Sequence, residues 1–211
     1  MRLDNYLIES DTYIRVDNAN ELIHRDCKTY LNLIRGKAPL FRGLHTASHD
    51  IGIKDVRKDR ESKGMGYELA KMFNKFLKDN GHSVRSQSVI CTSDYNHSQK
   101  FGHPYYIFPL DPIKKYTWVE ARDINIDFRS TGWSDDTVEA WAAKKDGRAN
   151  DHDKFILKKL MAPFERNFHT NTGFNEAYSK RFEIWFECDK YYYMDTEYLE
   201  WDDKRQSVIV L

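Results

Sequence analysis

The stretch Phe182-Glu183-Ile184-Trp185-Phe186-Glu187-Cys188 alternates between two sets of side chains. Successive residues of an extended chain point to opposite faces, so this period of two predicts a β-strand. One face carries Phe182, Ile184, Phe186 and Cys188, and the other carries Glu183, Trp185 and Glu187. An acid, Glu183, therefore stands at the start of a strand, where rigid backbone fixes its position.

Other aromatic and β-branched runs predict strands at residues 39–44, 84–93, 105–110, 116–119, 191–195 and 207–211. Residues 105–110 and 116–119 are expected to form a hairpin-like pair or a sheet edge. Apolar residues at helical spacing predict helices at residues 18–34, 67–80, 133–145 and 151–161. Strands and helices in this mixture predict an α+β fold.

The chain of 211 residues is short enough for a single core. We therefore expect one domain over residues 11–211, preceded by a short appendage at residues 1–10. Lys plus Arg (33) equals Asp plus Glu (33), so no long-range field attracts nucleic acid or a membrane surface. No apolar run reaches the roughly 18 residues of a membrane span, and we expect no membrane partner.

The cysteines are Cys27, Cys91 and Cys188, an odd number with no CxxC spacing. This pattern argues against a disulfide framework and against a zinc site, and it indicates a reducing compartment. Cys91 has no neighbouring His or Lys to activate it, so we expect it to be buried and structural. His45 and His49 lack a third ligand at suitable spacing, and we expect no bound metal.

Residues 1–10 form a short amphipathic segment that ends in Leu7-Ile8-Glu9-Ser10. One interpretation is a docking turn before the first helix. The segment also resembles the leader of internal head proteins of large tailed phages, which a phage prohead protease removes after a Leu-x-Glu or Ile-x-Glu triplet. Both interpretations stay open.

Arg42 is an unusual residue for its place, between Phe41 and Gly43 on a short predicted strand. Arg42 could pair with a buried carboxylate. Gly43 favours a ligand instead, because a residue without a β-carbon lets backbone N–H and C=O groups approach a carboxamide or phosphate. Thr92 and Ser93, at the end of another predicted strand, either hold a ligand or cap the following turn.

Three motifs in order resemble the Arg, Ser-Thr-Ser and Glu motifs of ADP-ribosyltransferases. They are Leu40-Phe41-Arg42-Gly43, Ile90-Cys91-Thr92-Ser93 followed by Phe101-Gly102, and Glu183-Ile184-Trp185-Phe186. The likeness spans about residues 40 to 195, and members from tailed phages are the most similar group. The resemblance implies a split mixed or antiparallel β-sheet core with flanking helices, NAD as the substrate, and no metal.

The resemblance also implies roles for these residues. Arg42 and Glu183 would be catalytic: Glu183 would stabilise the oxocarbenium-like ribose, and the Arg42 fork would bind the pyrophosphate or the adjoining ribose. Gly43 would offer backbone groups to the carboxamide. The hydroxyl of Thr92 or Ser93 would fix Glu183 or a ribose, and the ring of Tyr95 or Phe101 would stack on nicotinamide. The further residues that would bind the nucleotide are thus Cys91, Thr92, Ser93, Tyr95 and Phe101.

The sequence departs from the family pattern at two places. Cys91 replaces the first serine, and Arg181 stands where many arginine-modifying members carry Glu or Gln. The expected function is mono-ADP-ribosylation of a host protein or nucleic acid in the host cytoplasm, by a protein that is packaged in the phage head before injection. The alternatives are a non-catalytic internal head or host-interaction protein and an NAD glycohydrolase.

Two structural expectations follow from these roles. Arg42, Thr92 or Ser93, and Glu183 should converge on one cleft. Glu183 rather than Glu187 should be the reactive acid, because four strand residues span roughly 13 Å and only one acid can serve a given ribose.

Overall fold

The structure, a computed structural model, describes residues 11–45, 47, 49–58, 67–122, 140, 143, 147–148, 150–151, 167–197 and 199–210. The segment expected to be a leader, residues 1–10, lies outside these ranges. So does most of the two helices expected at residues 133–145 and 151–161.

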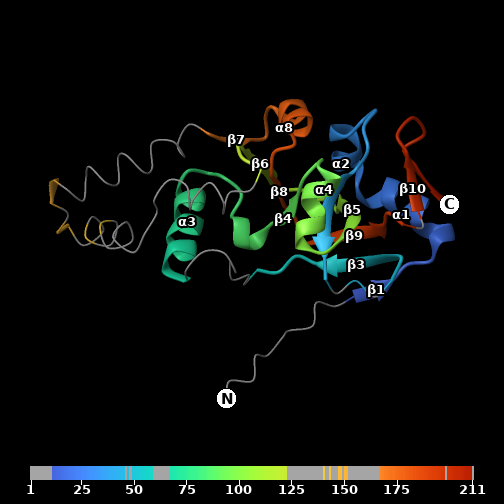
Figure 1. Cartoon of the computed structure of the whole chain (residues 1–211), viewed down its shortest axis with the longest axis horizontal. Coiled ribbons are helices and arrows are strands. Elements are labelled where there is room, and N and C mark those ends of the chain that lie inside the picture. Colours follow the sequence, from blue (N-terminus) through green and yellow to red (C-terminus); the bar gives the residue numbers. More distant parts are fainter. Residues whose placement is uncertain are drawn as a thin grey trace, which may run out of the picture.

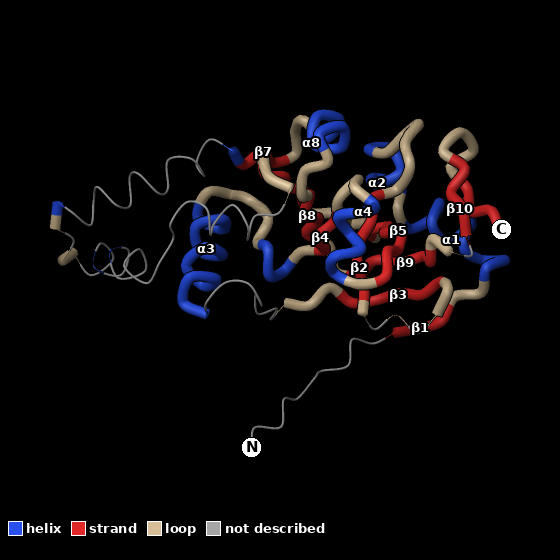
Figure 2. The backbone as a smooth tube through the Cα atoms, in the orientation of Figure 1, coloured by secondary structure: helices blue, strands red, loops and turns tan. Residues whose placement is uncertain are grey.

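The first of two larger sheets has five strands, and each pairing in it is antiparallel. In spatial order its strands are β1 (Asp11–Tyr13), β3 (Ile51–Asp55), β9 (Lys190–Asp195), β5 (His103–Pro109) and β2 (Leu40–Leu44). Figure 2 shows β2, β5, β9 and β3 close together to the right of the centre, with β1 at the lower edge. The sheet thus combines strands from the beginning, the middle and the end of the chain.

The second sheet has four antiparallel strands. In spatial order they are β4 (Val89–Cys91), β8 (Ile184–Glu187), β6 (Lys115–Val119) and β7 (Phe168–Thr170). A separate hairpin joins β10 (Leu199–Asp202) to β11 (Ser207–Val210). The α+β class predicted from the sequence is confirmed, and the sheets are antiparallel rather than mixed.

The two larger sheets meet at an isolated bridge between Phe41 and Thr92. The Phe41 N–H donates to the Thr92 carbonyl at 2.7 Å, and the Thr92 N–H donates to the Phe41 carbonyl at 3.0 Å. β2 is the last strand of one sheet and β4 the first of the other. The bridge therefore marks a split, where two edge strands touch before they separate.

Helices cover the sheets on several sides (Figure 1). They are α1 (Val16–Asp26), α2 (Lys28–Leu33), α3 (Tyr67–Asp79), α4 (Tyr95–Ser98) and α8 (Phe174–Lys180), with 3₁₀ turns η1 (Arg85–Gln87) and η2 (Gln99–Phe101). None of these described helices has both the length and the apolar character that a membrane span requires.

The alternation predicted for the Glu183 strand is confirmed, and both of its faces are buried. Ile184, Phe186 and Cys188 join the larger hydrophobic cluster, which α8 enters through Phe174. Trp185 joins a smaller cluster with residues of α3. β8 is therefore a central strand that separates two parts of the core.

Three predictions about the elements are wrong in detail. The helix expected at residues 18–34 is two helices, because Cys27 leaves helical geometry at φ −122° and ψ 29°. The expected pair of residues 105–110 and 116–119 does not form, since β5 and β6 belong to different sheets. The strand expected at residues 84–93 is shortened by η1.

Candidate functional site

The three motif strands are consecutive neighbours in space. β2 carries Arg42 and Gly43, β4 leads into Thr92 and Ser93, and β8 begins one residue after Glu183. The Phe41–Thr92 bridge joins β2 to β4, and the pair Cys91–Ile184 joins β4 to β8. Segments that are far apart in the sequence thus meet at the split between the sheets, near the centre of Figure 1.

Arg42 is half-buried, and its guanidinium lies 5.7 Å from the centre of the Tyr191 ring. Its Nη1 is buried and makes no hydrogen bond to any residue that the structure describes. A buried donor on a permanent cation is costly without an acceptor. The arrangement suits an anionic ligand. Among the described residues, no carboxylate forms an ion pair with Arg42.

Gly43 is needed for packing as well as for any ligand. A β-carbon there would lie 2.3 Å from the Ser98 carbonyl oxygen and 2.6 Å from the Phe101 carbonyl carbon, and both are backbone atoms that cannot turn away. The turn of α4 and η2 therefore lies directly on this residue. The side of Gly43 that a side chain would occupy is not open to a ligand.

The backbone groups of Gly43 face a different direction. The N–H and C=O of Phe41 are both hydrogen-bonded to Thr92 on β4. Because the backbone N–H and C=O groups of successive strand residues point to opposite sides, those of Arg42 point toward β5. Gly43 then turns its N–H and C=O toward the same edge as Phe41. They point into the gap where β2 and β4 diverge.

The hydroxyls of the second motif are engaged in the fold. Thr92 Oγ1 accepts from the Asp94 N–H at 3.1 Å, and Ser93 Oγ donates to the Tyr178 carbonyl at 2.5 Å. The sequence allowed these hydroxyls either to hold a ligand or to cap the following turn. In the structure Thr92 caps the turn, and Ser93 bonds its loop to α8. Cys91 is buried at 2% exposure, as predicted, and it forms no disulfide.

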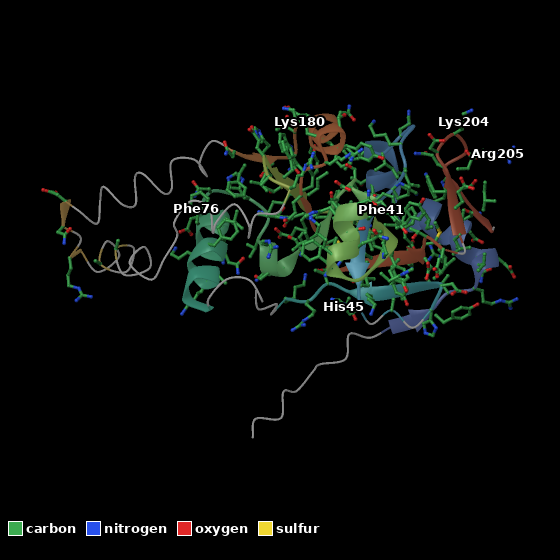
Figure 3. All side chains as sticks on the ribbon, in the orientation of Figure 1. Phe41, His45, Phe76, Lys180, Lys204 and Arg205 are labelled. Atoms are coloured by element: carbon green, nitrogen blue, oxygen red, sulfur yellow. The ribbon has the colours of Figure 1, made fainter. Side chains whose placement is uncertain are left out.

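Two aromatic side chains beside β2 are exposed. Tyr95 is 39% exposed and meets the Phe41 ring edge-on at 5.4 Å, and Phe101 is 44% exposed and packs on His97 at 5.2 Å. Figure 3 labels Phe41 in the middle of the molecule. Both exposed rings belong to the α4–η2 turn that covers Gly43, so they border the same split.

Glu183 is buried and strongly held. Its Oε1 accepts from Trp185 Nε1 at 2.6 Å and from Arg85 Nε at 3.2 Å. The Glu183 and Arg85 side chains are only 7% and 14% exposed. Sequence reasoning did not identify Arg85 as the partner, because the pair spans 98 residues and only the fold brings them together.

The strand register separates Arg42 from Glu183. Paired residues of neighbouring strands share a face, whereas consecutive residues alternate. Phe41 is paired with Thr92, so these two side chains share one face, and their chain neighbours Arg42 and Cys91 lie on the opposite face. Cys91 is paired with Ile184, so Ile184 lies on the Arg42 face and Glu183 lies on the other. The contact of Glu183 with Trp185 agrees with this assignment. The expectation that both side chains converge on one cleft is therefore wrong in this conformation.

Asp195 is a buried acid on the Arg42 face. Arg42 pairs with Tyr105, and Tyr105 pairs with Asp195 on the next strand, so all three side chains share one face. Asp195 is 6% exposed, and its Oδ1 lies 2.8 Å from His103 Nε2. No sequence spacing indicated this pair, which lies 92 residues apart.

Glu187 is the other acid of the β8 stretch. Its carboxylate lies 3.5 Å from Lys115 Nζ, and both side chains are partly exposed. It stands at the opposite end of β8 from Glu183 and away from the bridge. Of the two acids, Glu183 alone lies beside the split.

Comparisons of the chain with protein-family models, with curated proteins and with solved structures found no match. The function is therefore inferred from the residues and their geometry.

Proposed function

We propose that the chain transfers ADP-ribose from NAD to a host macromolecule, a protein or a nucleic acid. One observation carries the proposal: the strands that bear the Arg, Ser-Thr-Ser-like and Glu motifs are consecutive neighbours, β2, β4 and β8, across the split between two antiparallel sheets. A split of this kind is what the resemblance to ADP-ribosyltransferases implies. The α4–η2 turn with its exposed rings borders the same place.

In the proposed reaction the bond between nicotinamide and the ribose C1′ breaks, and its electron pair leaves with nicotinamide. A nucleophile of the acceptor bonds to C1′ and loses its proton. The passing oxocarbenium-like state is stabilised by a nearby carboxylate. We assign this purpose to Glu183, the acid of the third motif, whose strand β8 pairs with β4.

Arg42 and Gly43 would bind the dinucleotide. The Arg42 guanidinium is a permanently charged fork, and its buried Nη1 has no acceptor among the described residues. The pyrophosphate would supply that acceptor. The Gly43 N–H and C=O at the gap match the C=O and N–H₂ of a carboxamide.

Glu183 would reach the ribose only after a local rearrangement. Arg85 and Trp185 hold its carboxylate on the face opposite Arg42. Turnover therefore requires that the loop before β8, which contains Arg181 and Phe182, shifts when NAD binds. Arg181 sits in the left-handed region at φ 60°, a conformation that is uncommon for a residue other than glycine, so the turn before Glu183 is where we expect that shift.

A second candidate function is binding of a dinucleotide without turnover. The specific observation that favours it is the same buried Arg85–Glu183 pair, because a carboxylate that is already neutralised is poorly placed to stabilise a cation. On this alternative the protein is a host-interaction protein that keeps the split sheet and Arg42. Hydrolysis of NAD with water as acceptor is the third outcome.

Titration of the protein with NAD in a calorimeter, followed by incubation with labelled NAD and host lysate, separates these outcomes. The proposal predicts saturable binding, release of nicotinamide, and label on a macromolecule that depends on Arg42. Label only on free ADP-ribose indicates a hydrolase, and binding without nicotinamide release indicates a binder. Absence of NAD binding overturns all three.

Arg42→Gln is the test variant and Arg205→Gln the matched control. The Arg205 side chain is 81% exposed on the β10–β11 turn, far from Phe41 in Figure 3. Loss of a charge-assisted contact to a phosphate should weaken NAD binding by roughly tenfold or more in Arg42→Gln only. Equal affinity in the two variants would place the nucleotide elsewhere.

A further inference from the structure

We propose that His103, Asp195 and Glu197 form a binding site for a divalent transition-metal cation. His103 begins β5, Asp195 ends β9, and Glu197 lies in the turn that follows. One imidazole nitrogen and one oxygen from each carboxylate all lie within 4.8 Å of one another. The proposal does not depend on NAD.

The spacing of these atoms fits a single ion. Bonds of about 2.1 Å place neighbouring octahedral ligands roughly 3 Å apart and opposite ligands roughly 4.2 Å apart. His103 Nε2 and Asp195 Oδ1 are 2.8 Å apart, and the whole set falls within 4.8 Å. One ion can therefore touch all three residues after small side-chain adjustments.

The chemistry of the donors suits a first-row divalent metal. One imidazole with two carboxylates is a mixed nitrogen and oxygen set, which zinc and manganese accept, and three protein ligands leave open positions for water or substrate. Two carboxylates this close repel each other, and a cation between them removes that repulsion. Binding requires a lone pair on His103 Nε2, so any proton there is released to solvent.

The backbone holds the three residues in place. Asp195 is buried, and its Oδ1 also accepts from the Glu197 N–H at 2.8 Å, which fixes the turn relative to the strand. Thr196 Oγ1 donates to the Pro104 carbonyl at 3.0 Å and ties that turn to β5. The His103 side chain is 37% exposed, so the site is built on strands yet open to solvent.

The site lies on the face of the first sheet that carries Arg42. Arg42 pairs with Tyr105, which pairs with Asp195, and His103 is two residues from Tyr105 on β5. Both a cation here and Arg42 would thus add positive charge on one face of the first sheet.

Metal binding is measured on the full chain after removal of adventitious ions with a chelator and buffer exchange. Manganese is titrated with detection of the free aqueous ion by electron paramagnetic resonance, and zinc is titrated by calorimetry, both without NAD. We expect one ion per chain. Glu197→Gln, whose exposed side chain is not needed for folding, and Asp195→Asn should each weaken binding at least tenfold.

His169→Gln is the matched control, because His169 also contacts a carboxylate, that of Glu120 at 3.1 Å, but belongs to no group of three ligands in the described residues. It should bind metal as the unchanged protein does. The proposal fails if the unchanged protein binds neither metal at millimolar concentration, if Glu197→Gln binds equally well, or if His169→Gln loses as much affinity.

Discussion

Replacing Glu183 with glutamine tests the buried ion pair and with it the role of the acid. We expect this change to destabilise the fold, because Arg85, only 14% exposed, would lose its counter-charge. Removing one member of a buried pair costs about 3–5 kcal/mol. The amide oxygen can still accept from Trp185, so we expect the lower end, about 3 kcal/mol.

This loss is measured by urea unfolding at neutral pH, followed by tryptophan fluorescence and circular dichroism. For a chain of this length about 3 kcal/mol corresponds to a fall in Tm of roughly 6–12 °C. The matched control is Glu187→Gln, whose partner Lys115 is 3.5 Å away and whose side chain is 21% exposed. Glu187 Oε2 makes no hydrogen bond to the described residues, and the contact with Lys115 is a long one worth about 1 kcal/mol or less, so this variant should stay close to the unchanged protein.

A second change identifies the cause of the loss. Adding Arg85→Met to Glu183→Gln removes the buried unpaired charge, so the double variant should recover most of the lost stability. A loss below about 1 kcal/mol in Glu183→Gln, or no recovery in the double variant, would show that the pair does not control the site.

Three further predictions concern other parts of the fold. Gly43→Ala should lower the free energy of unfolding by about 1–3 kcal/mol, because the new methyl group meets the Ser98 carbonyl, and unchanged stability in urea would refute that packing. Burial, with the nearby positive charges second, lowers the pKa of His82, so the stability present above its ordinary pKa of about 6.5 should be lost as the pH falls below that value. His82→Gln should show a smaller fall in Tm between pH 7.5 and 5.5, and an equal fall would contradict this. Native thiols should resist labelling at pH 7.5, because burial raises the pKa of Cys188 to about 12 and the other cysteines are buried too; rapid labelling would count against it.

Local patterns in the sequence predicted much of the fold. The alternation around Glu183 predicted β8, because side chains on a central strand must suit the two faces they enter. The spacing of apolar residues predicted α3, which begins at Tyr67 as expected. The break at Cys27 was missed, since no glycine or proline marks it. The strands β1, β3, β7 and β10 were also missed, because pairing with a neighbour rather than local composition makes them strands.

The candidate site was harder to predict because it depends on long-range register. The order of the motif strands agreed with the sequence, but the face of each side chain changes with a shift of one residue. The bridge from Phe41 to Thr92 sets that register, and nothing local to either residue specifies it. Spacing along the chain also does not reveal Arg85, which contacts Glu183, or Asp195, which lies on the Arg42 face of the first sheet.

The release of nicotinamide from NAD by the purified protein tests the central claim most directly. It is followed by nuclear magnetic resonance with the unchanged protein and with Glu183→Gln, at a temperature where both are shown to be folded. The account predicts steady release by the unchanged protein and a rate lower by about 10²–10³ in the variant. No release by the folded, unchanged protein, or equal release by both proteins, would contradict it.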